Sequence, residues 1–103
     1  MKDAPFSEFV SSKKIVPLIG VYDVFSAILA AQRYDAIFCS GYGFSASHYG
    51  LPDEGFMAWP DLVAYVRRIR AVLPDTYIVV DIDDGFGDAN TASHVALCLA
   101  QVG

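Results

Sequence analysis

Four aspartates occupy the segment VDIDDGFGD, residues 80 to 88, which directly follows a run of apolar residues. In an extended strand Asp81 and Asp83 project to the same face, about 6.6 Å apart along the chain. Carboxylates this close repel each other, so a bound cation is the simplest compensation. Mg²⁺ is commonly held by one or two carboxylates together with waters and substrate oxygens, and Mn²⁺ prefers similar ligands. We therefore predict that Asp81 and Asp83 bind Mg²⁺ or Mn²⁺.

A simpler interpretation is that these aspartates only cap the helix that follows. Asp88 stands before ANTASHVAL and suits the N-cap position, and Asp84 is interpreted as a loop carboxylate. A calcium-binding EF-hand loop is excluded because its fifth and twelfth positions would be Gly85 and Ala92, which lack the required oxygen ligands.

A second candidate site lies in the segment SGYGFSA. The backbone N–H groups of Gly41 and Tyr42 and the hydroxyl of Ser40 could receive a carboxylate or phosphoryl oxygen. The spacing also fits the G-x-G-x-x-A pattern of dinucleotide sites, but Gly50 and Pro52 interrupt the long helix that such a site needs. Glycines that serve only a tight turn are the alternative interpretation.

Nucleophilic hydrolysis has little support in the sequence. Ser45 lies in no G-x-S-x-G elbow, and His48 has no evident orienting partner. His94 is interpreted as a helix-surface residue. Cys39 and Cys98 have neither metal-site nor disulfide-framework spacing and are expected to be reduced core thiols.

Three strands and three helices alternate along the chain and would position these residues. Apolar runs of strand length cover 15–21, 36–40 and 76–82, and helical patterns cover 22–34, 60–73 and 88–103, after a short amphipathic lead-in at 6–10. Several glycines and a proline predict a loop with one helical turn after the second strand. Alternation of this kind predicts parallel βαβ units in an α/β fold, with polar residues at the carboxyl ends of the strands.

The helices are each expected to present one apolar face. In the helix at 22–34 that face carries Phe25, Ile28 and Leu29. The basic cluster at 67–70 falls elsewhere on its helix and is interpreted as solvated surface.

Composition narrows the class of protein. The chain has 103 residues, of which 54% are hydrophobic, enough for one packed domain. Its net charge of -5 argues against a nucleic-acid partner, because binding to phosphates relies on clustered cations. Neither a secretory signal nor the roughly 18 apolar residues of a membrane span is visible. We therefore expect no membrane partner and a cytoplasmic location.

Three segments in order, GVYDVFSA, CSGYGFSASHYGLPDEG and VVDIDDGFGD, resemble the isocitrate lyase and phosphoenolpyruvate mutase superfamily. The resemblance runs from about residue 13 to the end of the chain. It implies a (β/α)8 barrel that binds Mg²⁺, assembles as a homo-oligomer (often a tetramer) and makes or breaks C–C or P–C bonds through an enolate-like intermediate.

The resemblance also implies roles for individual residues. Ser40, Gly41 and Tyr42 match the segment that holds the substrate, and Asp81 and Asp83 match the metal-binding aspartates, with Asp81 also near the substrate. Tyr22 and Asp53 match catalytic positions, Tyr22 in the YD pair with Asp23 and Asp53 in GLPD, where it orders metal-bound water or substrate. The superfamily more often reads D-A-D-T-G-Y-G where this chain has Ile82 and Asp84, a departure that bears on the metal geometry.

A full barrel needs roughly 250 residues, and only three of eight strands are predicted here. We therefore expect residues 1–103 to be the N-terminal portion of one barrel domain, in a chain that is truncated, nicked or split. The remainder of the barrel or a second chain would be its partner.

The GLPD segment resembles the methylisocitrate lyase, dimethylmalate lyase and carboxyphosphonoenolpyruvate mutase branches of the superfamily more than the phosphoenolpyruvate mutases. This resemblance favours a Mg²⁺-dependent C–C lyase acting on a 2-hydroxy di- or tricarboxylate of the methylisocitrate or dimethylmalate type. The alternatives are a phosphonate-forming mutase and an oxaloacetate-type decarboxylase. A hypothesis of another class is a non-catalytic fragment or pseudoenzyme partner.

Overall fold

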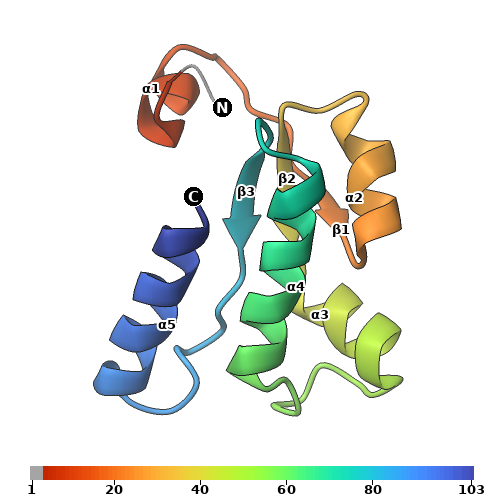
Figure 1. The fold of residues 1–103 in the computed structure, drawn as a ribbon, viewed down its shortest axis with the longest axis vertical. Coiled ribbons are helices and arrows are strands. Elements are labelled where there is room, and N and C mark those ends of the chain that lie inside the picture. Colours follow the sequence, from red (N-terminus) through yellow and green to blue (C-terminus); the bar gives the residue numbers. More distant parts are fainter. Residues whose placement is uncertain (1–3) are drawn as a thin grey trace.

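Three parallel strands form one sheet in the order β1-β2-β3 in the computed structural model, which describes residues 4–103 (Figure 1). The strands are β1 (Ile19–Val21), β2 (Ala36–Cys39) and β3 (Tyr77–Val80). The central strand β2 pairs with both neighbours in a register that sets Cys39 beside Val21 and Val80. The carboxyl ends of all three strands therefore lie at one edge of the sheet, as the sequence predicts.

The helices follow the expected alternation. They are α1 (Phe6–Ser11), α2 (Val24–Ala31), α3 (Gly41–Phe44), the π-helical turn η1 (Ser45–Tyr49), α4 (Trp59–Val72) and α5 (Ala89–Val102). Helix α4 packs against both α2 and α5, and the three helices cover one side of the sheet (Figure 1). Within the described residues, none of these helices combines the length and hydropathy that a membrane span requires.

The core lies between the sheet and helix α4. Ile37 and Cys39 of β2 and Tyr65 and Ile69 of α4 are fully buried there. Phe38, which points to the other face of the sheet, is only half-buried. Burial of Cys39 as a packed, free thiol agrees with the sequence-based interpretation.

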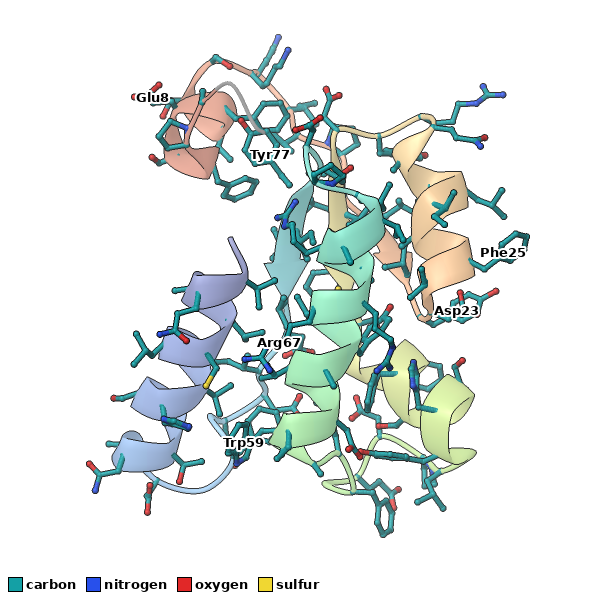
Figure 2. All side chains as sticks on the ribbon, viewed as in Figure 1. Glu8, Asp23, Phe25, Trp59, Arg67 and Tyr77 are labelled. Carbon is teal, nitrogen blue, oxygen red and sulfur yellow. The ribbon has the colours of Figure 1, made fainter. Side chains whose placement is uncertain are left out.

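Helix α2 corrects one prediction. Phe25, Ile28 and Leu29, expected to pack inward, are all exposed, and Phe25 points away from the rest of the chain (Figure 2). Ala27 and Ala30 are buried instead. Small side chains let the helix approach the sheet closely, so hydrophobic periodicity alone pointed to the wrong face.

Three further predictions need adjustment. Strand β1 is shorter than the apolar run at 15–21, because Pro17 lacks the N–H group that a ladder needs. Residues 41–49, predicted as mostly loop, are helical throughout. Arg67 and Arg68 are exposed as expected, but the Arg70 guanidinium is half-buried and donates to the carbonyls of residues 73, 74, 76 and 103.

Helix α1 lies at the amino ends of the strands, away from the polar rim. The ring of Phe9 stacks on Tyr77 with 4.5 Å between the ring centroids, and the Tyr77 hydroxyl donates to the carbonyl of Ala4 (Figure 2). This contact attaches the lead-in to the start of β3.

Candidate active site

The segment after β3 folds as a tight turn rather than as the extended strand the sequence predicts. The Asp81 N–H still donates to the Cys39 carbonyl at 3.3 Å, which continues the sheet by one residue. The Asp83 N–H then donates to Asp81 Oδ1 at 2.9 Å, and Asp83 takes a φ of 49°. The predicted same-face geometry of an extended strand is therefore wrong, although the turn still brings both carboxylates together.

Both carboxylates lie close to Gly41. This glycine follows Ser40, which is the first residue after β2. A Cβ placed on Gly41 would lie 3.4 Å from Asp81 Oδ2, 3.5 Å from Asp83 Oδ1 and 3.8 Å from Asp53 Oδ1. We call Asp53, Asp81 and Asp83 the carboxylate cluster. Because Gly41 has no side chain, three acidic groups from two separate loops can share one small space beside its backbone.

The cluster is electrostatically unfavourable without a cation. Partial desolvation raises the pKa of Asp83 above its ordinary value, and the nearby charges of Asp81, Asp53 and Asp84 raise it further. By contrast, the pKa of Asp88 is lowered by the hydrogen bonds it accepts from Thr91. The acidic groups around Asp83 therefore repel one another, unlike Asp88, and a bound cation would relieve this repulsion.

The other two aspartates have the structural roles predicted for them. Asp88 is the N-cap of α5 and accepts from the Thr91 N–H at 2.8 Å. Asp84 accepts from the Phe86 N–H at 3.0 Å within the loop.

A divalent cation of the Mg²⁺ type fits this donor set. All the candidate ligands are carboxylate oxygens, which Mg²⁺ and Mn²⁺ prefer. Within residues 4–103, no group of three or more His, Cys, Asp or Glu side chains is arranged so that it could hold a metal ion, so Asp53, Asp81 and Asp83 together are not a three-ligand site. An ion here would therefore take Asp81 and Asp83 as ligands and complete its shell with water or substrate oxygens, as Mg²⁺ commonly does.

Ser40 begins the helical segment that borders the carboxylate cluster. Its Oγ accepts from the Gly43 N–H at 3.2 Å as the N-cap of α3. The hydroxyl hydrogen stays available to donate to a ligand, because the cap uses only a lone pair. The side chain of Tyr42 is 71% exposed and is free to contact a ligand from the open side.

The YD pair after β1 lies against the same helical segment. A Cβ on Gly43 would lie only 3.0 Å from Tyr22 Cβ, so glycine permits this approach. The Tyr22 carbonyl accepts from His48 Nε2 at 3.0 Å. Asp23 caps α2 through a reciprocal pair of hydrogen bonds with Ser26. Asp23 therefore has a structural role, while the half-exposed Tyr22 side chain lies at the rim.

Sequence reasoning missed two residues that hold the GLPD loop. The Tyr49 hydroxyl donates to Asp61 Oδ2 at 2.6 Å and accepts from the Ala58 N–H at 3.2 Å. Partial burial raises the pKa of Tyr49, and the hydrogen bond to the Asp61 carboxylate raises it further. A Pro-Asp pair at a helix start identifies Asp61 as a first-turn acid, but no sequence signal points to Tyr49. His48, interpreted as lacking an orienting partner, contacts the Tyr22 carbonyl.

The remaining candidate nucleophiles lie outside this rim. His94 is exposed on α5, as expected, and its Nε2 lies 3.6 Å from the sulfur of Cys98. Cys98 is a free thiol but is only half-buried, so the expectation of two core thiols holds for Cys39 alone.

Residues 6–103 match the family model described as phosphoenolpyruvate phosphomutase. The 2,3-dimethylmalate lyase of Eubacterium barkeri is 37% identical over 89 residues, which cover 84% of this chain and 30% of that protein. The 2-methylisocitrate lyase of Salmonella typhimurium is 34% identical over 98 residues, which cover 94% of this chain and 32% of that protein. The chain thus spans about a third of the length of these relatives.

Solved structures agree with the sequence relatives. The phosphoenolpyruvate phosphomutase from Streptomyces platensis subsp. rosaceus matches with a TM-score of 0.86 and 26% identity, over 94% of this chain and 33% of that one. A 2,3-dimethylmalate lyase described as a PEP mutase/isocitrate lyase superfamily member matches with a TM-score of 0.83 and 25% identity, over 93% of this chain and 32% of that one.

The three parallel β/α units, with an acidic rim at the strand ends, thus have the fold of about a third of a (β/α)8 barrel of this superfamily. The chain belongs to the phosphoenolpyruvate phosphomutase family. Both the superfamily and the fold class inferred from the sequence are confirmed.

Proposed function

We propose that this chain supplies the metal- and substrate-binding part of a Mg²⁺-dependent enzyme that cleaves a C–C bond in a 2-hydroxy di- or tricarboxylate. The convergence of the carboxylate cluster on Gly41, beside the Ser40 cap, is the observation that carries this proposal. It pairs a site for a cation with potential donors for an anion at the same edge of the sheet.

Each residue has a role in the proposal. Asp81 and Asp83 would hold Mg²⁺ or Mn²⁺, and the bound ion would supply a Lewis acid that favours enolate formation. The Ser40 hydroxyl and the N–H groups of Gly41 and Tyr42 would receive a substrate carboxylate or oxyanion, since such groups stabilise negative charge. Asp81 would also contact the substrate.

Tyr22 and Asp53 are the proposed catalytic residues. The Tyr22 hydroxyl can donate a proton or hydrogen bond from the end of β1. The Asp53 carboxylate, 3.8 Å from the position of a Cβ on Gly41, can accept a hydrogen bond from water or substrate in the same space.

The relatives at 37% and 34% identity, which are named as 2,3-dimethylmalate and 2-methylisocitrate lyases, support a lyase. A carboxyvinyl-carboxyphosphonate phosphorylmutase of Arabidopsis thaliana, 38% identical over 85 residues, supports a mutase to a similar extent. The family model and a 33%-identical phosphoenolpyruvate phosphomutase of Streptomyces hygroscopicus support a phosphonate-forming mutase as the second candidate. An oxaloacetate-type decarboxylase is the third. A non-catalytic partner is the alternative of another class, and the charge repulsion retained at Asp83 argues against it.

The proposal extends to partners. The exposed face of α2, with Phe25, Ile28 and Leu29, would be covered by the remainder of the barrel or by a second chain. Assembly as a homo-oligomer, with a tetramer as the family expectation, and a cytoplasmic location complete the proposal.

Metal titration and a substrate panel together test this function. In the whole protein, isothermal titration with Mn²⁺ should show affinity weakened about 10- to 100-fold by Asp81→Asn or Asp83→Asn. Asp88→Asn is the matched control, because Asp88 caps α5 through the Thr91 amide, asparagine can keep that cap, and the Asp88 charge is not among those that raise the pKa of Asp83. Release of a 2-oxo acid or a dicarboxylate from 2,3-dimethylmalate or 2-methylisocitrate would support the lyase, and turnover of phosphoenolpyruvate or oxaloacetate alone would favour an alternative. Mn²⁺ affinity unchanged from the parent in both Asp81→Asn and Asp83→Asn would refute the metal site.

A further inference from the structure

The hydroxyl of Tyr49 joins the two ends of the loop that carries Asp53. Tyr49 ends η1, and residues 50–58 form the loop before α4 begins at Trp59. The hydroxyl donates its hydrogen to Asp61 in the first turn of α4 and accepts from the Ala58 amide at the end of the loop. The Tyr49 hydroxyl thus uses both its hydrogen and one oxygen lone pair to connect the start of the 50–58 loop to its end, which we call closing the loop base.

Little else holds the tip of this loop. The Gly50 and Leu51 amides bond back to Ala46 and Ser45, and the Glu54 amide bonds to Pro52 within the tip. Among residues 4–103, no hydrogen bond connects residues 52–56 to the sheet, and these five residues are all exposed. The end of the loop is fixed by the buried side chain of Met57 and by the Ala58 carbonyl, which accepts from the Asp61 and Leu62 amides. The Tyr49 hydroxyl is the side-chain group that links this end to the start of the loop.

The position of Asp53 nevertheless matters at the scale of ångströms. Its Oδ1 lies 3.8 Å from the Cβ position of Gly41, and its charge contributes to the raised pKa of Asp83. A small movement of the loop base would carry the Asp53 carboxylate out of the carboxylate cluster, because the tip is not tied to β2 or β3.

Tyr49 is itself fixed to the site. Its ring packs edge-on against the buried ring of Phe44, with 5.3 Å between the centroids. Phe44 also stacks on His48, whose Nε2 donates to the Tyr22 carbonyl. Residues 48 and 49, both in the π-helical turn, thus connect to opposite sides of the rim, His48 to the turn after β1 and Tyr49 to the 50–58 loop. Such turns are frequent at functional sites.

We propose that Tyr49 is a positioning residue, which closes the 50–58 loop through Asp61 and Ala58 and so holds the Asp53 carboxylate beside Asp81 and Asp83. This proposal rests on the proposed function, in which the carboxylate cluster binds a divalent cation.

A double-mutant cycle in the whole protein tests this role. Tyr49→Phe removes the hydroxyl and keeps the ring packing on Phe44, and it should weaken Mn²⁺ binding by about tenfold, as loss of an outer-shell partner does. In an Asp53→Asn background the same change should alter Mn²⁺ affinity less than about twofold, because residues that act through one group are not additive. Asp61→Asn keeps an acceptor oxygen and should retain most of the affinity.

Tyr34→Phe is the matched control. Tyr34 lies before β2 at the opposite edge of the sheet, and no hydrogen bond of its hydroxyl is found within residues 4–103. It should leave the Mn²⁺ affinity within about twofold of the parent value, the range expected of a distant and independent site.

Hydrogen exchange separates failure of this proposal from failure of the proposed function. Tyr49→Phe should speed exchange at the Ala58 amide and leave β2 unchanged, whether or not a metal binds. If the parent protein binds no Mn²⁺, the proposed function fails and exchange alone decides whether Tyr49 closes the loop. Unchanged exchange at Ala58, or equal loss of Mn²⁺ affinity with and without the Asp53 carboxylate, would overturn the proposal.

Discussion

A side chain at Gly41 would meet Asp81: the Cβ position of Gly41 lies 3.4 Å from Asp81 Oδ2. Asp83 and Asp53 approach the same point to 3.5 and 3.8 Å. An alanine here makes ordinary van der Waals contacts, but it fills the space that the three carboxylates share. A substitution at Gly41 should therefore affect ligand binding without destabilising the fold.

Gly41→Ala should weaken Mn²⁺ binding about tenfold and leave folding intact, since binding groups must be held within about 0.5 Å of the productive geometry. The melting temperature should stay the same or rise, because alanine favours a helical position over glycine by about 0.5–1 kcal/mol. Isothermal titration and thermal unfolding measure the two effects. Gly20→Ala, whose Cβ would meet nothing closer than 3.9 Å, is the control. A lower melting temperature with full Mn²⁺ affinity would show that Gly41 is structural.

The raised pKa of Asp83 predicts a pH dependence. A carboxyl group whose pKa is higher in the folded than in the unfolded state stabilises the fold below its unfolded pKa, and this contribution is lost as pH rises through the folded pKa. Without metal, Asp83→Asn should therefore be more stable than the parent at pH 7 and lose the advantage near pH 3. Urea unfolding at the two pH values, with and without Mg²⁺, measures this. Added Mg²⁺ should stabilise the parent more than Asp83→Asn, and a parent as stable as Asp83→Asn at pH 7 without metal would contradict the repulsion.

The sequence predicts which residues lie together at the carboxyl ends of the strands better than it predicts the local backbone there. The order of strands and helices follows from apolar runs and periodicity, and parallel pairing follows from their alternation. This places Tyr22, Ser40 and Asp81 at one rim without any coordinates. The turn at Asp83 could not be predicted, because it depends on a hydrogen bond from its own amide to Asp81 and on a positive φ that aspartate seldom adopts.

The glycines after β2 mislead in a different way. Gly41 and Gly43 predict a loop because glycine weakens helices, yet both lie in α3. Each is required by something outside the helix: Gly41 by the carboxylate cluster and Gly43 by the close approach of Tyr22. Tertiary packing of this kind leaves no local signal, and the same is true of the buried Ala27 face of α2.

The two cysteines should differ sharply in reactivity. Burial raises the pKa of Cys39 to about 12, so its thiolate is scarce at neutral pH as well as inaccessible. Cys98 is half-buried and exposed enough to react, with His94 as its neighbour. Titration with an aromatic disulfide reagent should find one reactive thiol in the native protein and two in denaturant. Cys98→Ser should have none before unfolding, and a native Cys98→Ser protein that still reacts would contradict the burial of Cys39.

Gly85 should be among the least replaceable residues of the loop before α5. Its φ is 87°, and a Cβ would lie 2.5 Å from the Cβ of Ala92. Gly85→Ala should cost about 3 kcal/mol or more, from backbone strain and overpacking together. Gly87→Ala has a φ of 130° but nothing within 4 Å, so it should show only the strain, about 1–2 kcal/mol. Urea unfolding of both variants separates the two contributions, and equal costs would show that Ala92 yields.

The 103-residue chain on its own should associate through α2. Phe25 is 70% exposed, and Ile28 and Leu29 lie beside it on the same helix. Strands β1 and β3 each have a free edge, because β2 alone has two partners in the described residues. Exposed apolar faces and unpaired strand edges both recruit other chains, so sedimentation should show species heavier than 11.2 kDa whose share rises with protein concentration.

Phe25→Glu together with Leu29→Glu should reduce this association, because the two substitutions place charge on the exposed face of α2 without changing the core. Leu97→Glu, which changes an exposed residue on α5, is the control and should leave the association largely unchanged. A monodisperse 11.2 kDa monomer of the parent chain would refute the idea that this face needs a partner.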